Sequence, residues 1–180
     1  MSTAELWSTE AVEAAFERGD EKALRAAYDA HGSLVYSFCR RSLGDDRAKD
    51  VTQEVFLSAW RARDRFDSSK GSLAAWLMGI TKNRVVDNIR AEQRHADRRS
   101  DAEPVELSIE ADVEQIGDRM LVADALRSLP ERSRMVIELA YLRDLTHTEI
   151  AEKFSIPLGT VKSDIRRGLA NIRRHLEVAG

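Results

Sequence analysis

The side chains best suited to chemistry in this chain are basic and polar ones near its C-terminus. From about Leu158 onwards, apolar residues recur at helical spacing, which predicts an amphipathic helix with a stripe of Val161, Ile165, Leu169 and Ile172. The remaining faces carry hydroxyl, ammonium and guanidinium groups from Thr160, Lys162, Ser163, Arg166, Arg167 and Arg174. Such groups bind phosphates and base edges in the major groove of DNA, so this helix is a candidate DNA reader.

The segment before this helix supports that interpretation. The sequence from Thr146 to Glu149 has the form of a capping box and predicts a short helix that buries Ile150, Ala151 and Phe154. A tight turn through Ile156 then leads into the basic helix. A second capping box at Ser128 to Glu131 predicts a preceding helix from about Pro130 to Arg143. A basic face alone is as often a solvated surface, but the two-helix arrangement favours a DNA-binding helix-turn-helix.

The N-terminal half also reads as helices. Apolar periodicity predicts helices over about 34–43 and 46–63, and a third that starts near Ser72. In the third helix the apolar stripe changes character halfway along, because continuing it by 3.6-residue steps leads to Asn83, Arg84, Asp87 and Asn88. Such a face either ends in a satisfied polar network or projects toward a polar partner.

Charge is distributed unevenly along the chain. Between Asp101 and Asp118 there are seven acidic residues and no basic one, which is typical of a linker. The flanking segments are basic, with six cations against three anions from Lys82 to Arg99 and six against one from Lys153 to Arg174. We therefore expect four segments: an extension over 1–20, a helical domain over 21–95, an acidic flexible linker over 96–118 and a helix-turn-helix domain over 119–180.

Composition restricts the class of protein. The chain has 180 residues, 43% apolar and 33% charged, with few aromatic, glycine or proline residues, which favours an all-α protein of two small domains. The single cysteine, Cys39, cannot form an internal disulfide, and we expect it to be buried and inert. Neither a signal peptide nor an apolar run of membrane-spanning length is present, so we expect a cytoplasmic protein.

Catalysis finds little support in the sequence. Phosphate-binding glycine loops and the common hydrolase and metalloprotease motifs are absent, and the four histidines are scattered. Asp45, Asp46 and Asp50 sit at a predicted helix start, where carboxylates are favoured by capping and by the helix dipole rather than by a metal. We expect no enzyme activity, no metal, no cofactor and no small-molecule substrate.

Three stretches together resemble the bacterial sigma-70 family: DVTQEVFLSAWRARDRFD, then GSLAAWLMGITKNRVVDNIR, then SLPERSRMVIELAYLRDLTHTEIAEKFSIPLGTVKSDIRRGLANIR. The short two-domain form resembles an extracytoplasmic-function (ECF) sigma factor, and the likeness covers about Leu24 to Leu176. It implies a transcription-initiation subunit with a region 2-like and a region 4-like domain, whose partners are promoter DNA and core RNA polymerase, through the β′ clamp helices and the β flap. An anti-sigma factor, often membrane-bound, is a further partner that the resemblance implies.

The resemblance assigns roles to residues. It implies polymerase binding by Asp50, Gln53, Glu54 and Trp60. Recognition and melting of the minus-10 element would fall to Phe66, Lys70, Asn83, Arg84, Asn88 and Arg90, with Phe66 to Ser72 capturing an unstacked base. Recognition of the minus-35 element would fall to Thr160, Lys162, Ser163, Arg166 and Arg167. Asp164 departs from the basic residue common in the family, and we expect it to mark which minus-35 sequence is read, either by accepting from a cytosine amino group or by pairing with Lys162 or Arg167.

Other interpretations stay open at this stage. The acidic linker is either a solubilising tether, which we favour, or a nucleic-acid mimic that occupies a basic channel of the polymerase and discourages free sigma from binding DNA. The principal alternative function is a two-domain helix-turn-helix regulator that acts on duplex operators without replacing sigma. A helical scaffold or enzyme accessory protein with an incidental helix-turn-helix is another, but it leaves the two basic segments and the polar half of the third helix without a common explanation.

Overall fold

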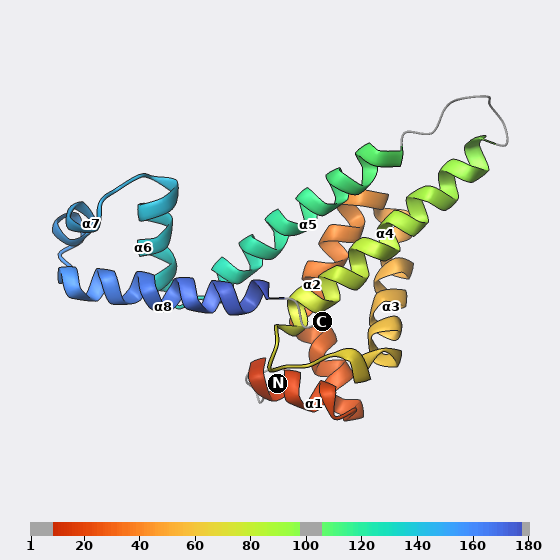
Figure 1. Ribbon diagram of the computed structural model, residues 1–180, viewed down its shortest axis with the longest axis horizontal. Coiled ribbons are helices and arrows are strands. Elements are labelled where there is room, and N and C mark those ends of the chain that lie inside the picture. Colours follow the sequence, from red (N-terminus) through yellow and green to blue (C-terminus); the bar gives the residue numbers. More distant parts are fainter. Residues whose placement is uncertain (1–8, 98–105, 178–180) are drawn as a thin grey trace. The chain divides into compact units, whose positions relative to one another are not determined.

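The computed structural model describes residues 9–97 and 106–177, and in these two ranges the chain is helical with no β-strand (Figure 1). The chain divides into two compact units, with the division inside one long helix, between Leu121 and Val122. We call these the N-terminal unit and the C-terminal unit. The expected all-α class with two helical domains is confirmed.

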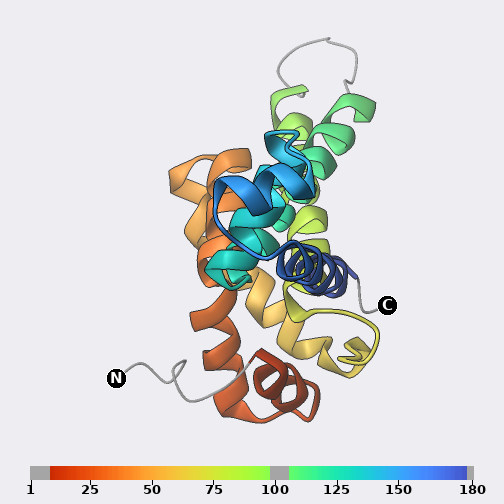
Figure 2. The same ribbon diagram turned by 90° about the vertical axis from the view of Figure 1, so that its left-hand side faces the viewer.

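The N-terminal unit is a helical bundle. It contains α1 (Thr9–Glu17), α2 (Glu21–Leu43), α3 (Asp45–Arg61), a short 3₁₀ turn η2 (Arg63–Arg65) and α4 (Leu73–Asp97). Helices α2, α3 and α4 pack against one another, and α1 packs across the end of α2 (Figures 1 and 2). Asp20 caps α2 by accepting a hydrogen bond from the Lys22 amide at 2.9 Å. The helix predicted over 34–43 is therefore the second half of a longer one.

Helix α1 belongs to the bundle, which corrects the expectation that residues 1–20 form an extension. Phe16 is fully buried, and its ring meets those of Trp60, Phe66 and Trp76 edge-on, with centroids 5.5 to 6.2 Å apart. The buried Glu13 accepts a hydrogen bond from the Leu73 amide at 3.0 Å. A carboxylate at this point satisfies an amide that the first turn of α4 leaves unpaired. The expectation was wrong for Thr9–Glu17.

The C-terminal unit contains α6 (Glu131–Leu142), α7 (His147–Lys153) and α8 (Leu158–Leu176), together with the end of α5 (Glu106–Ser128). Its core is formed by Leu129, Val136, Ile137, Ile150, Val161 and Ile165. The capping box at Thr146 is present, because the Thr146 hydroxyl accepts from the Glu149 amide and the Glu149 carboxylate accepts from the Thr146 amide. Helices α7 and α8 occur where the sequence predicted them, with Ile150 buried as expected, but Phe154 is 39% exposed, so its expected burial was wrong.

The capping box expected at Ser128 was wrong. Pro130 occupies the N-cap of α6, where no side chain accepts a cap hydrogen bond, and the Ser128 hydroxyl donates instead to the Ala125 carbonyl at 2.8 Å. Proline has no amide hydrogen and its ring restricts the backbone, so it defines this helix start without a side-chain cap.

The expectation of a flexible linker over 96–118 was wrong for the part that the structure describes from residue 106 onwards. Helix α5 begins at Glu106 and continues to Ser128, through most of the acidic stretch. Val113 and Leu121 are buried along this helix, and Gly117 lets it approach the Lys82 side chain, because a Cβ there would meet the Lys82 stem. Residues 98–105 of the expected linker lie outside the described residues.

Candidate nucleic-acid and polymerase interfaces

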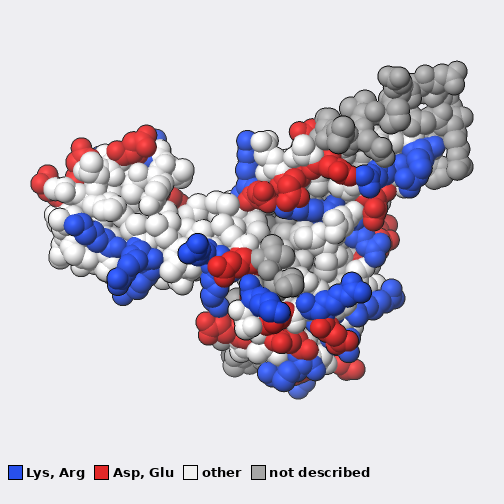
Figure 3. Space-filling model, in the orientation of Figure 1, with Lys and Arg blue, Asp and Glu red and all other residues white. Residues whose placement is uncertain are grey.

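Helix α8 presents a basic face on a helix-turn-helix core. Lys162, Arg166 and Arg167 are exposed. Thr160 and Ser163 are half-buried, and the Ser163 hydroxyl donates a hydrogen bond to the Thr160 carbonyl at 2.9 Å. Figure 3 shows Lys and Arg side chains gathered over α8. Cations and hydroxyls arranged in this way suit contacts to phosphates and base edges.

The buried stripe of α8 differs from the predicted one. Val161 and Ile165 are buried as expected, but Leu169 is 37% exposed and Gly168 faces the core in its place. A Cβ at Gly168 would meet the end of the Ile137 side chain of α6, so the glycine leaves room for that side chain between the two helices. The stripe pattern alone did not reveal this, because a glycine adds nothing to an apolar periodicity.

Asp164 is a buried ion-pair centre, so of the two expected roles the pairing with Arg167 is present, whereas burial contradicts direct contact with a base. Its side chain is 2% exposed and accepts from the Arg132 Nε at 2.6 Å and from Arg167 at 2.7 Å. The hydrogen bond from Arg132 is the largest influence on the pKa of Asp164, which is lowered although burial acts in the opposite direction. Asp164 therefore joins α6 to α8, and Arg132 is a cation of this surface that sequence reasoning missed.

The polar half of α4 is partly exposed and partly engaged within the chain. Asn83 and Arg84 are exposed, and the Arg84 guanidinium donates to the Ser58 hydroxyl at 2.7 Å. Asn88 donates to the Arg84 carbonyl at 3.0 Å, and Arg90 forms an ion pair with Glu110 of α5. Each of the two interpretations therefore describes a part of this face. Asn88 and Arg90 belong to a polar network within the chain, whereas Asn83 and Arg84 remain exposed to a polar partner.

The segment between η2 and α4 does not present Phe66 to a partner. Phe66 is 2% exposed, with its ring 5.4 Å from that of Trp76 and 6.1 Å from that of Phe16, so the expectation that it contacts promoter DNA is contradicted by burial. Lys70 is exposed and pairs with Asp67 at 2.9 Å. Hydrogen bonds, first from the Ser69 hydroxyl and then from Lys70, lower the pKa of Asp67 to about 2.

The residues expected to bind polymerase share one face of α3. Asp50, Gln53 and Glu54 are exposed, and their spacing places them side by side on the helix. Trp60 is half-buried, with its ring 5.5 Å from that of Phe16 and the Arg63 guanidinium 4.9 Å above it. Most of the Trp60 ring therefore supports the bundle, and only its outer part remains available to a partner.

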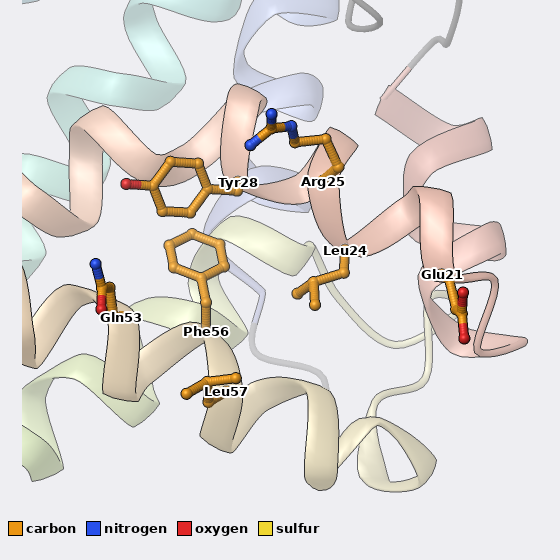
Figure 4. Close-up of a pocket in the computed structure, with 7 residues that line it drawn as sticks. All are labelled: Glu21, Leu24, Arg25, Tyr28, Gln53, Phe56 and Leu57. Atoms are coloured by element: carbon orange, nitrogen blue, oxygen red, sulfur yellow. The ribbon is translucent and has the colours of Figure 1, made fainter.

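An apolar groove lies between α2 and α3 beside this face. It has a volume of about 500 Å³ and is lined by Glu21, Leu24, Arg25, Tyr28, Gln53, Phe56 and Leu57 (Figure 4). Tyr28 is 43% and Leu57 51% exposed, although neighbouring apolar side chains of the same helices are buried. This groove was not predicted from the sequence. The signal that could have revealed it is the presence of apolar residues on α2 and α3 outside the stripe that each helix buries in the core.

Other chemistry-bearing residues are structural or scattered in the part of the chain that the structure describes. Cys39 is fully buried, as expected, and burial raises its pKa to about 11. In the described residues, no group of three or more His, Cys, Asp or Glu side chains is placed to hold a metal ion. None of the helices described here combines the length and apolar character that crossing a bilayer requires.

Comparison with known proteins identifies both units. Residues 27–95 match the family model of sigma-70 region 2, and residues 125–174 match that of sigma-70 region 4. An ECF RNA polymerase sigma factor, SigK of Mycobacterium tuberculosis H37Rv, is 35% identical over 167 residues, which cover 89% of each chain. SigK of Mycobacterium ulcerans is 36% identical over 168 residues and 90% of each chain. Rhodobacter sphaeroides SigE, solved in complex with the anti-sigma ChrR, is 27% identical over 97% of this chain and 99% of its own, with a TM-score of 0.42.

The two matched regions define a sigma-70 type transcription-initiation factor. With relatives above 30% identity over most of its length, the chain belongs to the ECF family of RNA polymerase sigma factors. The expectation from the sequence motifs is confirmed, and a regulator that acts without replacing sigma is not favoured.

Proposed function

We propose that this sigma factor divides its work between three surfaces. The exposed residues of α3, with the adjoining apolar groove, bind the β′ clamp helices of core polymerase. Helix α4 and the loop that carries Lys70 bind the melted minus-10 element, and α8 binds the minus-35 duplex while the C-terminal unit contacts the β flap. The observation that supports this best is the exposed basic face of α8, held on a capped helix-turn-helix core. The factor works in the cytoplasm, where transcription occurs, and itself catalyses no reaction.

The proposed minus-10 surface excludes Phe66. Lys70, Asn83 and Arg84 are exposed and provide an ammonium, an amide and a guanidinium for a single-stranded backbone. Melting requires that the open strand be held more tightly than the duplex, and cations contribute to that difference without reading sequence. Asn88 and Arg90 contact the single strand once their contacts with Arg84 and Glu110 inside the chain are released.

We propose that an anti-sigma factor holds this protein inactive. Rhodobacter sphaeroides SigE was solved with the anti-sigma ChrR, and the resemblance stated above implies a partner of this kind. The groove between α2 and α3 offers such a partner an apolar seat bordered by the expected polymerase-binding residues. A protein bound there would compete with polymerase for Gln53, which lines the groove.

The test of this function is reconstitution with sigma-free core polymerase on a library of bacterial DNA. We expect transcripts that start at defined promoters only when the protein is present. The double variant Gln53→Ala, Glu54→Ala should bind core polymerase about tenfold more weakly, because exposed polar contacts at an interface contribute on the order of 1 kcal/mol. Folded protein that neither binds core nor directs any transcript would refute the proposal.

Arg166 provides a prediction for minus-35 recognition. Arg166→Ala should weaken holoenzyme binding to a promoter duplex by about tenfold and lower the slope of log affinity against log salt by about 1, because one cation leaves the DNA. The matched control is Arg41→Ala, which removes an exposed arginine from α2 with the same change in net charge. Equal effects of the two variants would show that α8 is not the reading helix.

A further inference from the structure

Acidic side chains of α5 lie against the polar and basic half of α4. We call Glu110, Glu114 and Asp118 the acidic strap; they are spaced by four residues and so share one face of α5. All three belong to the N-terminal unit, and Figure 1 shows α5 running alongside α4 there. The strap therefore faces the helix to which minus-10 binding is assigned above.

Ion pairs join the strap to cations of α4. The Lys82 ammonium lies 2.6 Å from a Glu114 oxygen and 2.7 Å from an Asp118 oxygen, and Arg90 pairs with Glu110. The Lys82 side chain is only 14% exposed. Burial lowers the pKa of Lys82, but the hydrogen bonds that its ammonium donates to Asp118 and Glu114 outweigh burial and the pKa is raised, so this ammonium stays charged.

The strap also shares a cavity with minus-10 candidates. A cavity of about 440 Å³ between the two helices is lined by Lys82, Asn83, Val86, Asp87, Arg90, Glu110, Val113 and Glu114. Asn83 and Arg90 are expected DNA contacts that line this cavity together with Glu110 and Glu114, and Arg90 is paired with Glu110. A nucleic-acid backbone presents anionic oxygens to the same cations, so the strap and DNA cannot both pair with Lys82 and Arg90.

We propose that the acidic strap is an autoinhibitory mimic of the DNA backbone, which covers Lys82 and Arg90 in the free protein and leaves α4 when promoter DNA binds. Lys82 thereby joins the residues that contact single-stranded DNA. This inference rests on the proposed role of α4 and adds to it the reason that free sigma would bind DNA weakly.

The contacts between the strap and α4 are of a kind that DNA can displace. The strap carboxylates keep much of their exposure, with Glu114 62% and Asp118 63% exposed, and exposed ion pairs add little to stability. Val113 is the buried apolar residue of α5 that accompanies them in the cavity. Val113 and Leu121 are the buried apolar residues of α5 described in this unit, so ion pairs provide much of its attachment to α4, and a partner that carries many phosphates can compete for those pairs.

The experiment measures binding of the full-length free protein to a fluorescein-labelled single-stranded DNA of random sequence, about 20 nucleotides long. The variant Glu110→Gln, Glu114→Gln, Asp118→Asn removes the strap charges and keeps side-chain shape. We expect it to bind about tenfold more tightly than the wild type at low salt, because no carboxylate competes with phosphate for Lys82 and Arg90. The charge-matched control is Asp29→Asn, Asp112→Asn, Glu131→Gln, which neutralises three exposed acids outside the strap. Its affinity for the single strand should rise less than about threefold.

Two further measurements separate the strap from the role of α4. Arg84→Ala should weaken single-strand binding by the wild type and by the strap variant to the same extent, because Arg84 is exposed on α4 and makes no ion pair with the strap. Hydrogen exchange of residues 109–121 in the wild type should rise when the single strand is added, which tests release without any substitution. A strap variant that binds no tighter than its control, with unchanged exchange, would overturn the autoinhibition. If Arg84→Ala then still impaired transcription by the holoenzyme, the role of α4 would stand.

Discussion

Replacing Phe66 with alanine is expected to destabilise the N-terminal unit by about 3 to 5 kcal/mol, the range for removing a fully buried phenylalanine ring. Phe66 is 2% exposed and its ring contacts those of Phe16 and Trp76. Truncation leaves a cavity among large rigid rings, which cannot close it by small movements. The dominant effect is therefore a loss of stability, with any loss of promoter melting following from it.

Urea unfolding followed by tryptophan fluorescence measures this effect. The chain's tryptophans, Trp7, Trp60 and Trp76, all precede residue 122, so the signal reports on the N-terminal unit. Leu57→Ala is the control, because Leu57 is 51% exposed and should change stability by less than about 1 kcal/mol. If Phe66→Ala unfolded with the wild-type midpoint and yet failed to melt promoters, the burial argument would be wrong and a role in base capture restored.

Local signals explain what could be predicted from the sequence. The capping box at Thr146 and the start of α8 at Leu158 depend on residues within one or two turns, and both are present in the structure. The family motifs placed the two domains in the correct order, with the polymerase and DNA candidates Gln53, Arg84 and Arg166 on exposed helical faces. Whether those residues bind their assigned partners stays a prediction.

The predictions for the acidic linker and for Phe66 were wrong because contacts with residues distant in the sequence determine the structure there. The acidic run was interpreted as a linker because it holds seven acidic residues and no basic one, yet Glu114 and Asp118 pair with Lys82, more than 30 positions away in the sequence. Phe66 was assigned to DNA by its motif, and its packing against Phe16 of α1 and Trp76 of α4 shows that it is enclosed. Periodicity does not contain such pairings, because they are set by how helices cross.

Asp164→Asn is expected to destabilise the C-terminal unit by about 2 kcal/mol at neutral pH, since hydrogen bonds to a charged group contribute about 1.5 to 3 kcal/mol. Asparagine preserves the volume but removes the charge that holds Arg132 of α6 and Arg167 of α8. Hydrogen exchange of amides in α6 and α8 measures the loss. Asp144→Asn is the control, because Asp144 is exposed in the same unit and its positive φ of 53° suits asparagine equally well.

The destabilisation caused by Asp164→Asn should become smaller as the pH is lowered. The pKa of Asp164 is lowered in the folded state, so its contribution is complete well above the unfolded value of 3.8 and is lost as the pH falls through the lowered pKa. The stability difference between the wild type and Asp164→Asn should therefore shrink as the solution is acidified below about pH 4. A difference that stayed constant through this range would mean that the carboxylate charge does not stabilise the unit.

DNA binding by the same variant separates two roles of the carboxylate. If Asp164 acted mainly by repelling phosphates, its neutralisation would tighten holoenzyme binding to a minus-35 duplex. Because the carboxylate is buried and already paired with two arginines, we expect the opposite result: weaker binding, since Arg167 loses the contact that fixes its guanidinium on α8. Asp164 would then influence the minus-35 element through the position of Arg167 rather than by touching a base, and tighter binding by Asp164→Asn would contradict this.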